Sequence, residues 1–431
     1  MIVLSGAELV LPDRILTPGT LAIDGDRIAD IRPGGAAGRN FGGHAASLFA
    51  FHGHYIVPGF IDVHVHGVDG SDSLDGDDSV RSIAARLPRY GVTAFCPTTI
   101  ACAPGPLRGV LDQVRRARQT PEPRSARVLP AHLESNFINP EMRGAQPMGC
   151  LRNPRAALAG GVGRPAACPE VRLRPASSAN ERDARSEESQ AGAEDFDAAD
   201  ILREIERAAP DVGIVTIASE LEGGLDLVRW LAARGHRPSL GHSNATYDEA
   251  LAAIAAGARH ATHLFNRMPP LGHRAPGLAG AILQTDEIAA ELICDGFHVH
   301  PALMRTAIAA KGASRVLAIT DGTAASGLAV GRRARLGSHS ITVGESAAFL
   351  DDGTIAGSVL TMDRAFQLLI GRIGLSPVDA VTMCSTTPAR ELALVGHGVL
   401  APDAVADLVV LDAQFGVVQT YIGGQLVYSR S

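Results

Sequence analysis

One pattern recurs eight times between about residues 59 and 325. A short run rich in Val, Ile and Ala ends on a polar residue, and a helical pattern follows. Amphipathic helices are clearest at 225–234 and 247–256, the second preceded by the candidate caps Asn244 and Thr246. Eight alternations of strand and helix predict an α/β fold, a parallel (β/α)8 barrel with its reactive residues at the carboxyl ends of the strands. The strands are expected at 60–66, 92–98, 128–134, 213–220, 238–242, 259–263, 288–295 and 316–321.

One interval is far longer than the others, the one between the third and fourth strand ends, Glu134 and Glu220. Within it, residues 152–197 are rich in Ala, Gly, Pro, Arg, Ser and Glu, and residues 177–192 hold no Val, Ile, Leu or aromatic side chain. Such a composition cannot bury enough apolar surface to order itself. We expect a flexible insertion here, either a lid over the site or a solvated segment with no catalytic importance.

Both ends of the chain have a different sequence pattern, in which short β-rich pieces alternate with turn residues. The Gly423-Gly424 pair between two such pieces is a hairpin signal. We expect one small β domain made from residues 1–56 and 396–431, flanking a barrel at 57–395. Its strands are expected at 1–4, 7–11, 20–23, 27–31, 406–411, 417–422 and 425–428.

Composition narrows the class of protein further. Hydrophobic residues make up 46% of the 431 residues, so a large core can form, and a net charge of -7 with no basic patch argues against a nucleic-acid or anionic-membrane partner. The chain shows neither a signal-peptide pattern nor a long apolar run. Six scattered cysteines without CxxC spacing fit a reducing compartment, so a cytoplasmic protein is expected.

Metal-ligand side chains collect at the predicted strand ends. His64 and His66 are two apart on the first strand and therefore share a face, the barrel interior. Imidazole and carboxylate together suit a divalent ion such as Zn²⁺, with Fe²⁺, Mn²⁺ and Co²⁺ as alternatives. Six ligands exceed the need of one tetrahedral ion, so one ion or two ions bridged by Glu134 or a hydroxide are considered, and metal-assisted hydrolysis is indicated. The other four candidates, on strands three, five, six and eight, are Glu134, His242, His263 and Asp321.

Asp321 is also the best candidate for the general acid and base, because a carboxylate beside an activated water can take its proton and pass it to a leaving nitrogen. The alternatives are a plain ligand or a helix N-cap. Cationic and amide groups that suit an anion lie beyond strands six and seven: Asn266, Arg267, Arg274 and His298.

Several segments carry a family resemblance. The segment 57–67 (VPGFIDVHVHG) is shared by many amidohydrolases, whereas 262–266 (THLFN), 295–298 (DGFH) and 357–362 (GSVLTM) are typical of one branch. The segments 132–134 (HLE), 241–245 (GHSNA) and 320–322 (TDG) also match. The chain resembles the amidohydrolase superfamily and, within it, the N-acetylglucosamine-6-phosphate deacetylase family.

The resemblance implies a TIM-type barrel beside a small β-sandwich from both termini, a homodimer, and removal of acetate from N-acetylglucosamine 6-phosphate to leave glucosamine 6-phosphate. It implies that Glu134, His242 and His263 hold the common metal, that His64 and His66 add a second, and that Asp321 is the catalytic acid and base. It also implies that Arg267, through its backbone, binds the sugar phosphate together with Asn266, Arg274 and His298.

The chain departs from the family pattern on the loop that shapes the acyl and sugar pocket. Ser135-Asn136 replaces Gly-Pro, and Gly144-Ala145-Gln146 stands where the family usually has Gly-x-His, so Ala145 and Gln146 are expected at the substrate. A glutamine can donate a hydrogen bond but cannot become a cation. Two alternatives therefore stay open: a hydrolase of another N-acyl amino sugar, its phosphate or an N-acyl amino acid, and a catalytically silent sugar-binding barrel.

Overall fold

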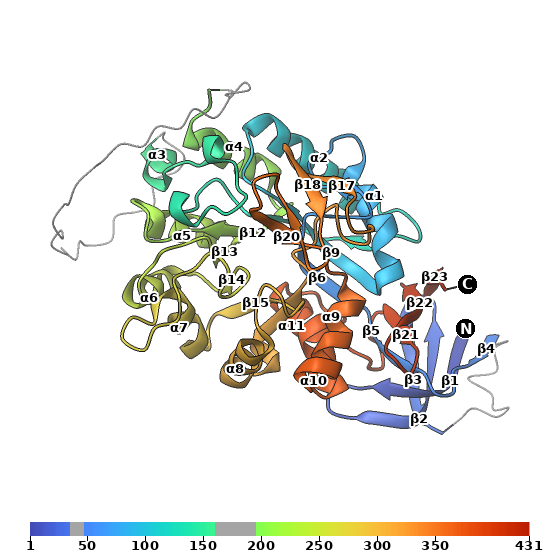
Figure 1. Ribbon diagram of the computed structural model, residues 1–431. Coiled ribbons are helices and arrows are strands. Elements are labelled where there is room, and N and C mark those ends of the chain that lie inside the picture. Colours follow the sequence, from blue (N-terminus) through green and yellow to red (C-terminus); the bar gives the residue numbers. More distant parts are fainter. Residues whose placement is uncertain (35–46, 160–194, 431) are drawn as a thin grey trace.

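The computed structural model describes residues 1–34, 47–159 and 195–430. Its centre is a nearly closed barrel of parallel strands in chain order (Figure 1), which confirms all eight expected strands. An isolated bridge between Val65 and Gly322 links the first strand to the segment after the last. The strands are β6 (Phe60–Val65), β9 (Val92–Thr99), β11 (Ala131–Leu133), β12 (Val212–Ile217), β13 (Arg237–Leu240), β14 (His260–Ala261), β15 (Ala289–Ile293) and β16 (Val316–Ile319).

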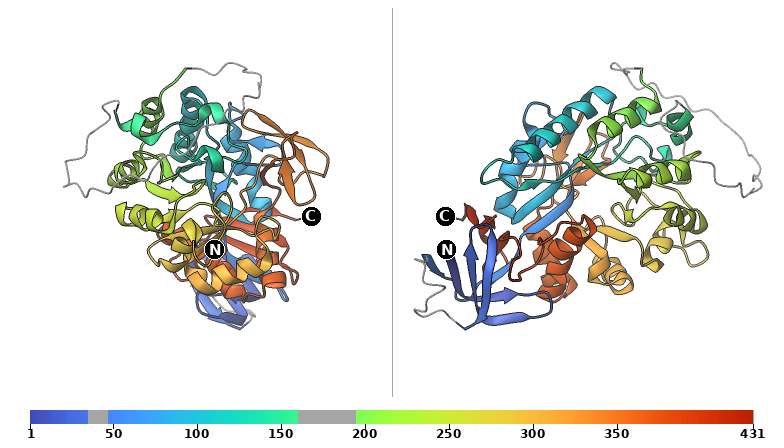
Figure 2. Two further views of the ribbon diagram at one scale, coloured as in Figure 1. Left: turned by 60° about the vertical axis from the view of Figure 1, so that its left-hand side comes forward. Right: turned by 180° about the vertical axis from the view of Figure 1, so that it is seen from behind.

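Helices surround the barrel (Figure 2), and their caps follow from the sequence. Thr246 and Glu249 form a capping box at the start of α6, so Thr246 is the cap of the two residues considered. Both expected amphipathic helices are present, as α5 and α6. The main helices are α1 (Ser79–Arg86), α2 (Pro104–Gln119), α3 (Pro154–Ala159), α4 (Ala198–Ala208), α5 (Gly224–Ala233), α6 (Tyr247–Ala256), α7 (Gly277–Gln284), α8 (Pro301–Lys311), α9 (Met362–Leu368), α10 (Pro377–Val381) and α11 (Thr387–Glu391).

Apolar side chains fill the barrel below the strand ends. On β15, Ala289 and Ile293 belong to this interior cluster, together with Leu317 and Ile319 of β16. Because side chains alternate between the two faces of a strand, Glu291, midway between Ala289 and Ile293, also points into the barrel. The interior is therefore a packed core with its polar groups gathered near the carboxyl ends of the strands.

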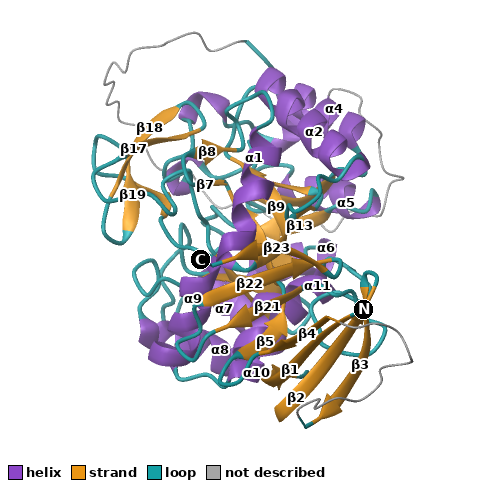
Figure 3. Ribbon diagram, turned by 90° about the vertical axis from the view of Figure 1, so that its right-hand side faces the viewer, coloured by secondary structure: helices purple, strands orange, loops and turns teal. Residues whose placement is uncertain are grey.

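The two ends of the chain combine into a separate sheet (Figure 3), as expected, in the order β23-β22-β21-β5-β1-β2-β3, with β4 paired to β1. It has its own hydrophobic core. The pieces expected at 1–4 and 7–11 form one strand, β1, because register shifts on both sides of Ala7 absorb the irregular residues between them. The strands are β1 (Ile2–Val10), β2 (Ile15–Asp24), β3 (Arg27–Pro33), β4 (Ser47–Ala50), β5 (Tyr55–Pro58), β21 (Leu408–Leu411), β22 (Val417–Ile422) and β23 (Gln425–Ser429).

A second, smaller antiparallel sheet follows the last barrel strand and was not expected from the sequence (Figure 1). It consists of β17 (Arg333–Leu336), β18 (His339–Val343), β19 (Ala347–Phe349) and β20 (Ile355–Ser358). Of the expected insertion at 152–197, the structure describes residues 152–159, which include α3, and residues 195–197; residues 160–194 lie outside the described part. Within the described ranges, every helix is too short or too polar to cross a membrane.

Candidate metal centre

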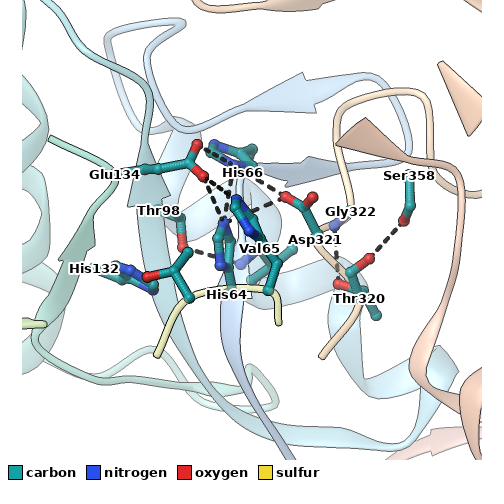
Figure 4. Close-up of polar contacts among 12 residues, drawn as sticks. His64, Val65, His66, Thr98, His132, Glu134, Thr320, Asp321, Gly322 and Ser358 are labelled. Carbon is teal, nitrogen blue, oxygen red and sulfur yellow. Dashed lines mark hydrogen bonds and ion pairs between the residues drawn. The ribbon is translucent and has the colours of Figure 1, made fainter. Parts of the chain in front are cut away.

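All six expected ligand residues meet at the carboxyl ends of the barrel strands. Figure 4 shows four of them, His64, His66, Glu134 and Asp321. His64 belongs to β6 and His66 follows it, while the other four come directly after or shortly after β11, β13, β14 and β16. All six are buried, and the most exposed of them, Asp321, keeps 8% of its surface accessible. The strand ends of the barrel therefore form one compact polar centre.

Glu134 is shared by two groups of ligand atoms. Its Oε1 lies 2.7 Å from His242 Nε2 and 2.8 Å from His263 Nε2, and these two nitrogens are 3.0 Å apart. Its Oε2 lies 3.6 Å from His66 Nε2, which is 3.3 Å from His64 Nε2. In both groups, the candidate donor atoms lie within 4.8 Å of one another.

The hydrogen bonds at the far side of the imidazole rings show that these groups suit a cation. His242 Nδ1 lies 2.7 Å from the Met142 carbonyl oxygen, an acceptor, so the ring hydrogen is assigned to Nδ1 and Nε2 carries a lone pair. That lone pair faces the Glu134 carboxylate at 2.7 Å. Two acceptors at this distance need a proton or a metal ion between them, so the donor set fits a divalent metal.

The electrostatics of the buried cluster also favour a bound cation. Burial by itself lowers the pKa of His64, but the carboxylates of Glu291, Asp321 and Glu134 outweigh it and raise the pKa to about 10. Burial raises the pKa of Asp321, but the lowering effect of His64 and His66 is larger, so the pKa of Asp321 lies below its usual value. Buried carboxylates thus create a negative potential that favours a bound cation.

Three of the six residues have left-handed backbone conformations, which side chains other than glycine rarely adopt: φ is 47° at His242, 29° at His263 and 48° at Asp321. Neighbouring strands hold Asp321 in place, because its N–H donates to the His64 carbonyl oxygen and its carbonyl oxygen accepts from Ser358 N–H, both at 2.9 Å. Strained backbone of this kind persists where the surroundings over-determine it, typically at functional sites. No helix begins at Asp321 in the described chain, so the N-cap alternative is excluded.

A pocket of 440 Å³ opens above the centre. His66, Glu134 and Asp321 line it, and so do Leu336, Ile355 and Gly357 at the small antiparallel sheet. Arg274 lies outside it, with an exposed guanidinium 2.7 Å from His273 Nε2, so its expected anion role stays a prediction. Of the expected substrate residues, those in the lining are Ala145, Gln146, Asn266, Arg267 and His298.

Gln146 contacts the metal centre directly. Its Oε1 accepts from Ala101 N–H at 2.7 Å, which orients the amide so that Nε2 donates to Glu134 Oε2.

Ser135-Asn136, the other departure from the family pattern, stabilises the same loop. Ser135 Oγ donates to the Thr216 carbonyl oxygen at 2.5 Å, and Asn136 Nδ2 donates to the carbonyl oxygens of residues 102 and 150.

Beneath the ligands lie three buried polar residues that the sequence analysis did not assign to the site, His132, His260 and Glu291. Glu291 accepts from His64 Nδ1 at 2.8 Å and from His260 Nε2 at 2.9 Å. A signal existed, since Glu291 is a charged residue at the centre of the apolar run 288–294. Glu291 was missed because it lies in the middle of β15, whereas the candidate ligands were sought at the strand ends.

The fold, the ligand set and the pocket together are those of a barrel enzyme whose centre suits a divalent metal ion. The chain belongs to the amidohydrolase family, whose model matches residues 55–427. Its similarity is to the branch of this family that deacetylates amino-sugar phosphates.

Two curated relatives and one solved structure illustrate this. The N-acetylglucosamine-6-phosphate deacetylase of Bacillus subtilis is 31% identical over 86% of this chain and 84% of its own length. The N-acetylgalactosamine-6-phosphate deacetylase of Escherichia coli O157:H7 is 31% identical over 86% of this chain and 87% of its own. A variant of the Mycobacterium smegmatis N-acetyl-D-glucosamine-6-phosphate deacetylase, solved with N-acetyl-D-glucosamine-6-phosphate, has a TM-score of 0.81 and 29% identity over 99% of each chain.

Proposed function

We propose that the protein is a metal-dependent deacetylase that hydrolyses N-acetylglucosamine 6-phosphate to glucosamine 6-phosphate and acetate. The observation that carries the proposal is the cluster of six buried polar residues at the strand ends, five of which, all but His64, line a 440 Å³ pocket. A volume of this order suits a small ligand. The relatives named above act, by their names, on acetylated amino-sugar phosphates.

His64, His66, Glu134, His242 and His263 would hold one or two divalent ions, with zinc favoured over iron, manganese or cobalt because of the imidazole-rich donor set. When bound, such an ion lowers the pKa of water and stabilises charge on an amide oxygen. Asp321 takes a proton from the attacking water and delivers it to the amine nitrogen as the C–N bond breaks. Water and amide thus give acetate and a free amine.

Recognition of the phosphorylated sugar is assigned to the rim of the pocket. His298 is held through Nδ1 by Asp295 Oδ2 at 2.5 Å, and its buried Nε2 finds no hydrogen-bond partner among the described residues. Since His298 lines the pocket, this nitrogen is available to a ligand. Arg267 and Asn266 supply a cation and an amide on the same rim.

A second candidate substrate is N-acetylgalactosamine 6-phosphate, which differs in the orientation of one hydroxyl group. Two observations favour testing it: the similarity to the Escherichia coli deacetylase of that sugar, and Gln146 in place of the histidine usual in the family. The orientation of Gln146 toward Glu134 and Ala101 changes the hydrogen-bonding groups beside the acyl position.

The deciding experiment measures acetate release by metal-replete protein from N-acetylglucosamine 6-phosphate, N-acetylgalactosamine 6-phosphate and unphosphorylated N-acetylglucosamine. We expect the highest kcat/KM for the first and a strong preference for phosphate over its absence. Preference for the galactose epimer would favour the second candidate. Absence of turnover with all three would refute the proposal and favour another N-acyl substrate or a silent binding barrel.

The homodimer implied by the resemblance and the cytoplasmic location expected from the cysteine pattern remain predictions. Sedimentation equilibrium of the purified chain checks the first, and fractionation of the source cell checks the second.

A further inference from the structure

The buried carboxylate of Glu291 lies directly beneath the metal centre. Glu291, in the middle of β15, is 0% exposed and faces the barrel interior. It is not one of the six ligand residues, and it does not line the pocket. Its position between the apolar core and the ligands raises the question of what a charge does there, since an unpaired buried charge is strongly unfavourable.

Hydrogen bonds from three sides satisfy this carboxylate. Oε1 accepts from His260 Nε2 at 2.9 Å. Oε2 accepts from His64 Nδ1 at 2.8 Å and from the backbone N–H of His263 at 3.1 Å. The second oxygen therefore contacts one residue of each ligand group, because His64 groups with His66 and His263 groups with His242.

The contact with His64 fixes which ring nitrogen carries the hydrogen. With Nδ1–H directed at Glu291, Nε2 is the ring nitrogen left for a metal ion, and it faces His66 Nε2 and Asp321 Oδ1, each at 3.3 Å. The contact with His263 acts on the backbone instead. It holds the N–H of a residue whose φ of 29° is otherwise unfavourable.

A separate metal site at Glu291, formed with His64 and His132, is the competing interpretation, because the three donor atoms lie close together. The hydrogen bonds of His132 argue against it. Its Nδ1 lies 3.0 Å from the Val63 carbonyl oxygen, an acceptor, which places the ring hydrogen on Nδ1. Its Nε2 is occupied by the Thr216 hydroxyl at 3.0 Å. His132 thus offers no free lone pair toward Glu291.

We propose that Glu291 is a positioning residue that orients the His64 ring and the His263 backbone through one carboxylate oxygen, and so sets the geometry and the metal affinity of both ligand groups. The inference rests on the proposed metal centre. Outer partners of metal-binding histidines typically change metal affinity about 10- to 100-fold when they are removed.

The test compares metal affinities of purified variants by competition with a chromophoric chelator for Zn²⁺, and ligand geometry by the visible spectrum of the Co²⁺ form. Glu291→Met keeps the length of the side chain and removes both acceptors, and we expect affinity about 10- to 100-fold weaker and an altered Co²⁺ spectrum. Glu291→Gln keeps one carbonyl oxygen for the two N–H groups, so a smaller loss is expected.

Glu204 provides a matched control. Its carboxylate is also buried, at 4% exposure, but it lies on α4 and pairs with Arg108 and Arg207. Glu204→Met and Glu204→Gln should bind Zn²⁺ as tightly as the parent protein does. If both controls lose affinity as much as the Glu291 variants, the effect is one of general stability, and the proposal is overturned.

Unchanged Zn²⁺ affinity in Glu291→Met would also overturn the proposal. Circular dichroism of the metal-free protein checks its folding, and where Glu291→Met does not fold, Glu291→Gln carries the test, with affinity equal to that of the parent as the refuting result. Failure of the proposed function is distinguishable, because it is seen in the parent protein as absence of metal binding or of deacetylation.

Discussion

Replacement of Asp321 by Asn separates proton transfer from metal binding. Two carboxylate residues line the described pocket, Glu134 and Asp321. Glu134 already binds His242 and His263 through Oε1 and Gln146 through Oε2. Asp321 Oδ1 lies 3.3 Å from His64 Nε2 and from His66 Nε2, and the Asp321 side chain keeps 11% of its surface exposed. Asp321 is thus the carboxylate available to accept a proton from water in the pocket.

The expected magnitude follows from what the Asp321→Asn side chain lacks. The amide keeps the shape of the carboxylate but cannot take up a proton at neutral pH. General acid–base catalysis contributes about 10²- to 10⁴-fold, so kcat should fall by that factor, which corresponds to about 3–5 kcal/mol in the activation barrier. Neither of the two closely spaced ligand groups around Glu134 includes Asp321, so bound metal should be retained.

The assay is acetate release at saturating N-acetylglucosamine 6-phosphate, with metal content measured by plasma emission on the same samples. Asp352→Asn, an exposed carboxylate in the turn before β20, is the control and should leave kcat unchanged. Full activity of Asp321→Asn with its metal retained would refute the assigned role. Loss of metal together with activity would refute the separation of the two functions.

Three other perturbations have defined outcomes. Gly144→Ala should raise KM for the phosphorylated substrate, because φ is +61° at this position and the added Cβ would lie 2.6 Å from Nε of Arg267, which lines the pocket. An unchanged KM in steady-state kinetics would contradict this. Asp407→Asn breaks the ion pair between Arg127 and the segment that leads into β21 of the terminal sheet. It should lower the free energy of unfolding, measured in urea titrations, by about 2–3 kcal/mol. This loss is smaller than for a fully buried ion pair because the Arg127 side chain is 37% exposed. Burial raises the pKa of Asp407, but His397 and Arg127 shift it below its usual value. The stabilising contribution of Asp407 is therefore complete above the unfolded pKa of about 3.9 and is lost as pH falls through the lower folded pKa. The Asp407→Asn variant should accordingly show a smaller acid dependence of the free energy of unfolding.

The barrel and its ligands were predictable because both depend on local periodicity. A buried parallel strand is an apolar run, and the residue at its carboxyl end lies at the mouth of the barrel, so Glu134, His242, His263 and Asp321 could be placed together before their distances were known. The terminal sheet was predictable for a similar reason, since the Gly423-Gly424 turn identifies a hairpin.

Other parts of the site depend on contacts between distant loops, which spacing does not determine. The direction of the Arg274 side chain is set by its loop, and the structure places it outside the pocket. The bond from Gln146 to Glu134 needs the Ala101 N–H from a third segment to orient the amide. The sheet β17–β20, whose strands are three to five residues long, was not predicted.

The terminal sheet also has a consequence for how the chain is made. β5 pairs along one edge with β1, which precedes it by about fifty residues, and along the other with β21, whose residues Leu408–Leu411 come some 350 positions later. During synthesis the first three strands can pair as soon as they leave the ribosome, but β5 keeps an open edge until almost the whole chain has been translated. Unpaired edges of this kind recruit other strands. Expression yield should therefore depend on translation speed and chaperone supply more than on the stability of the finished barrel.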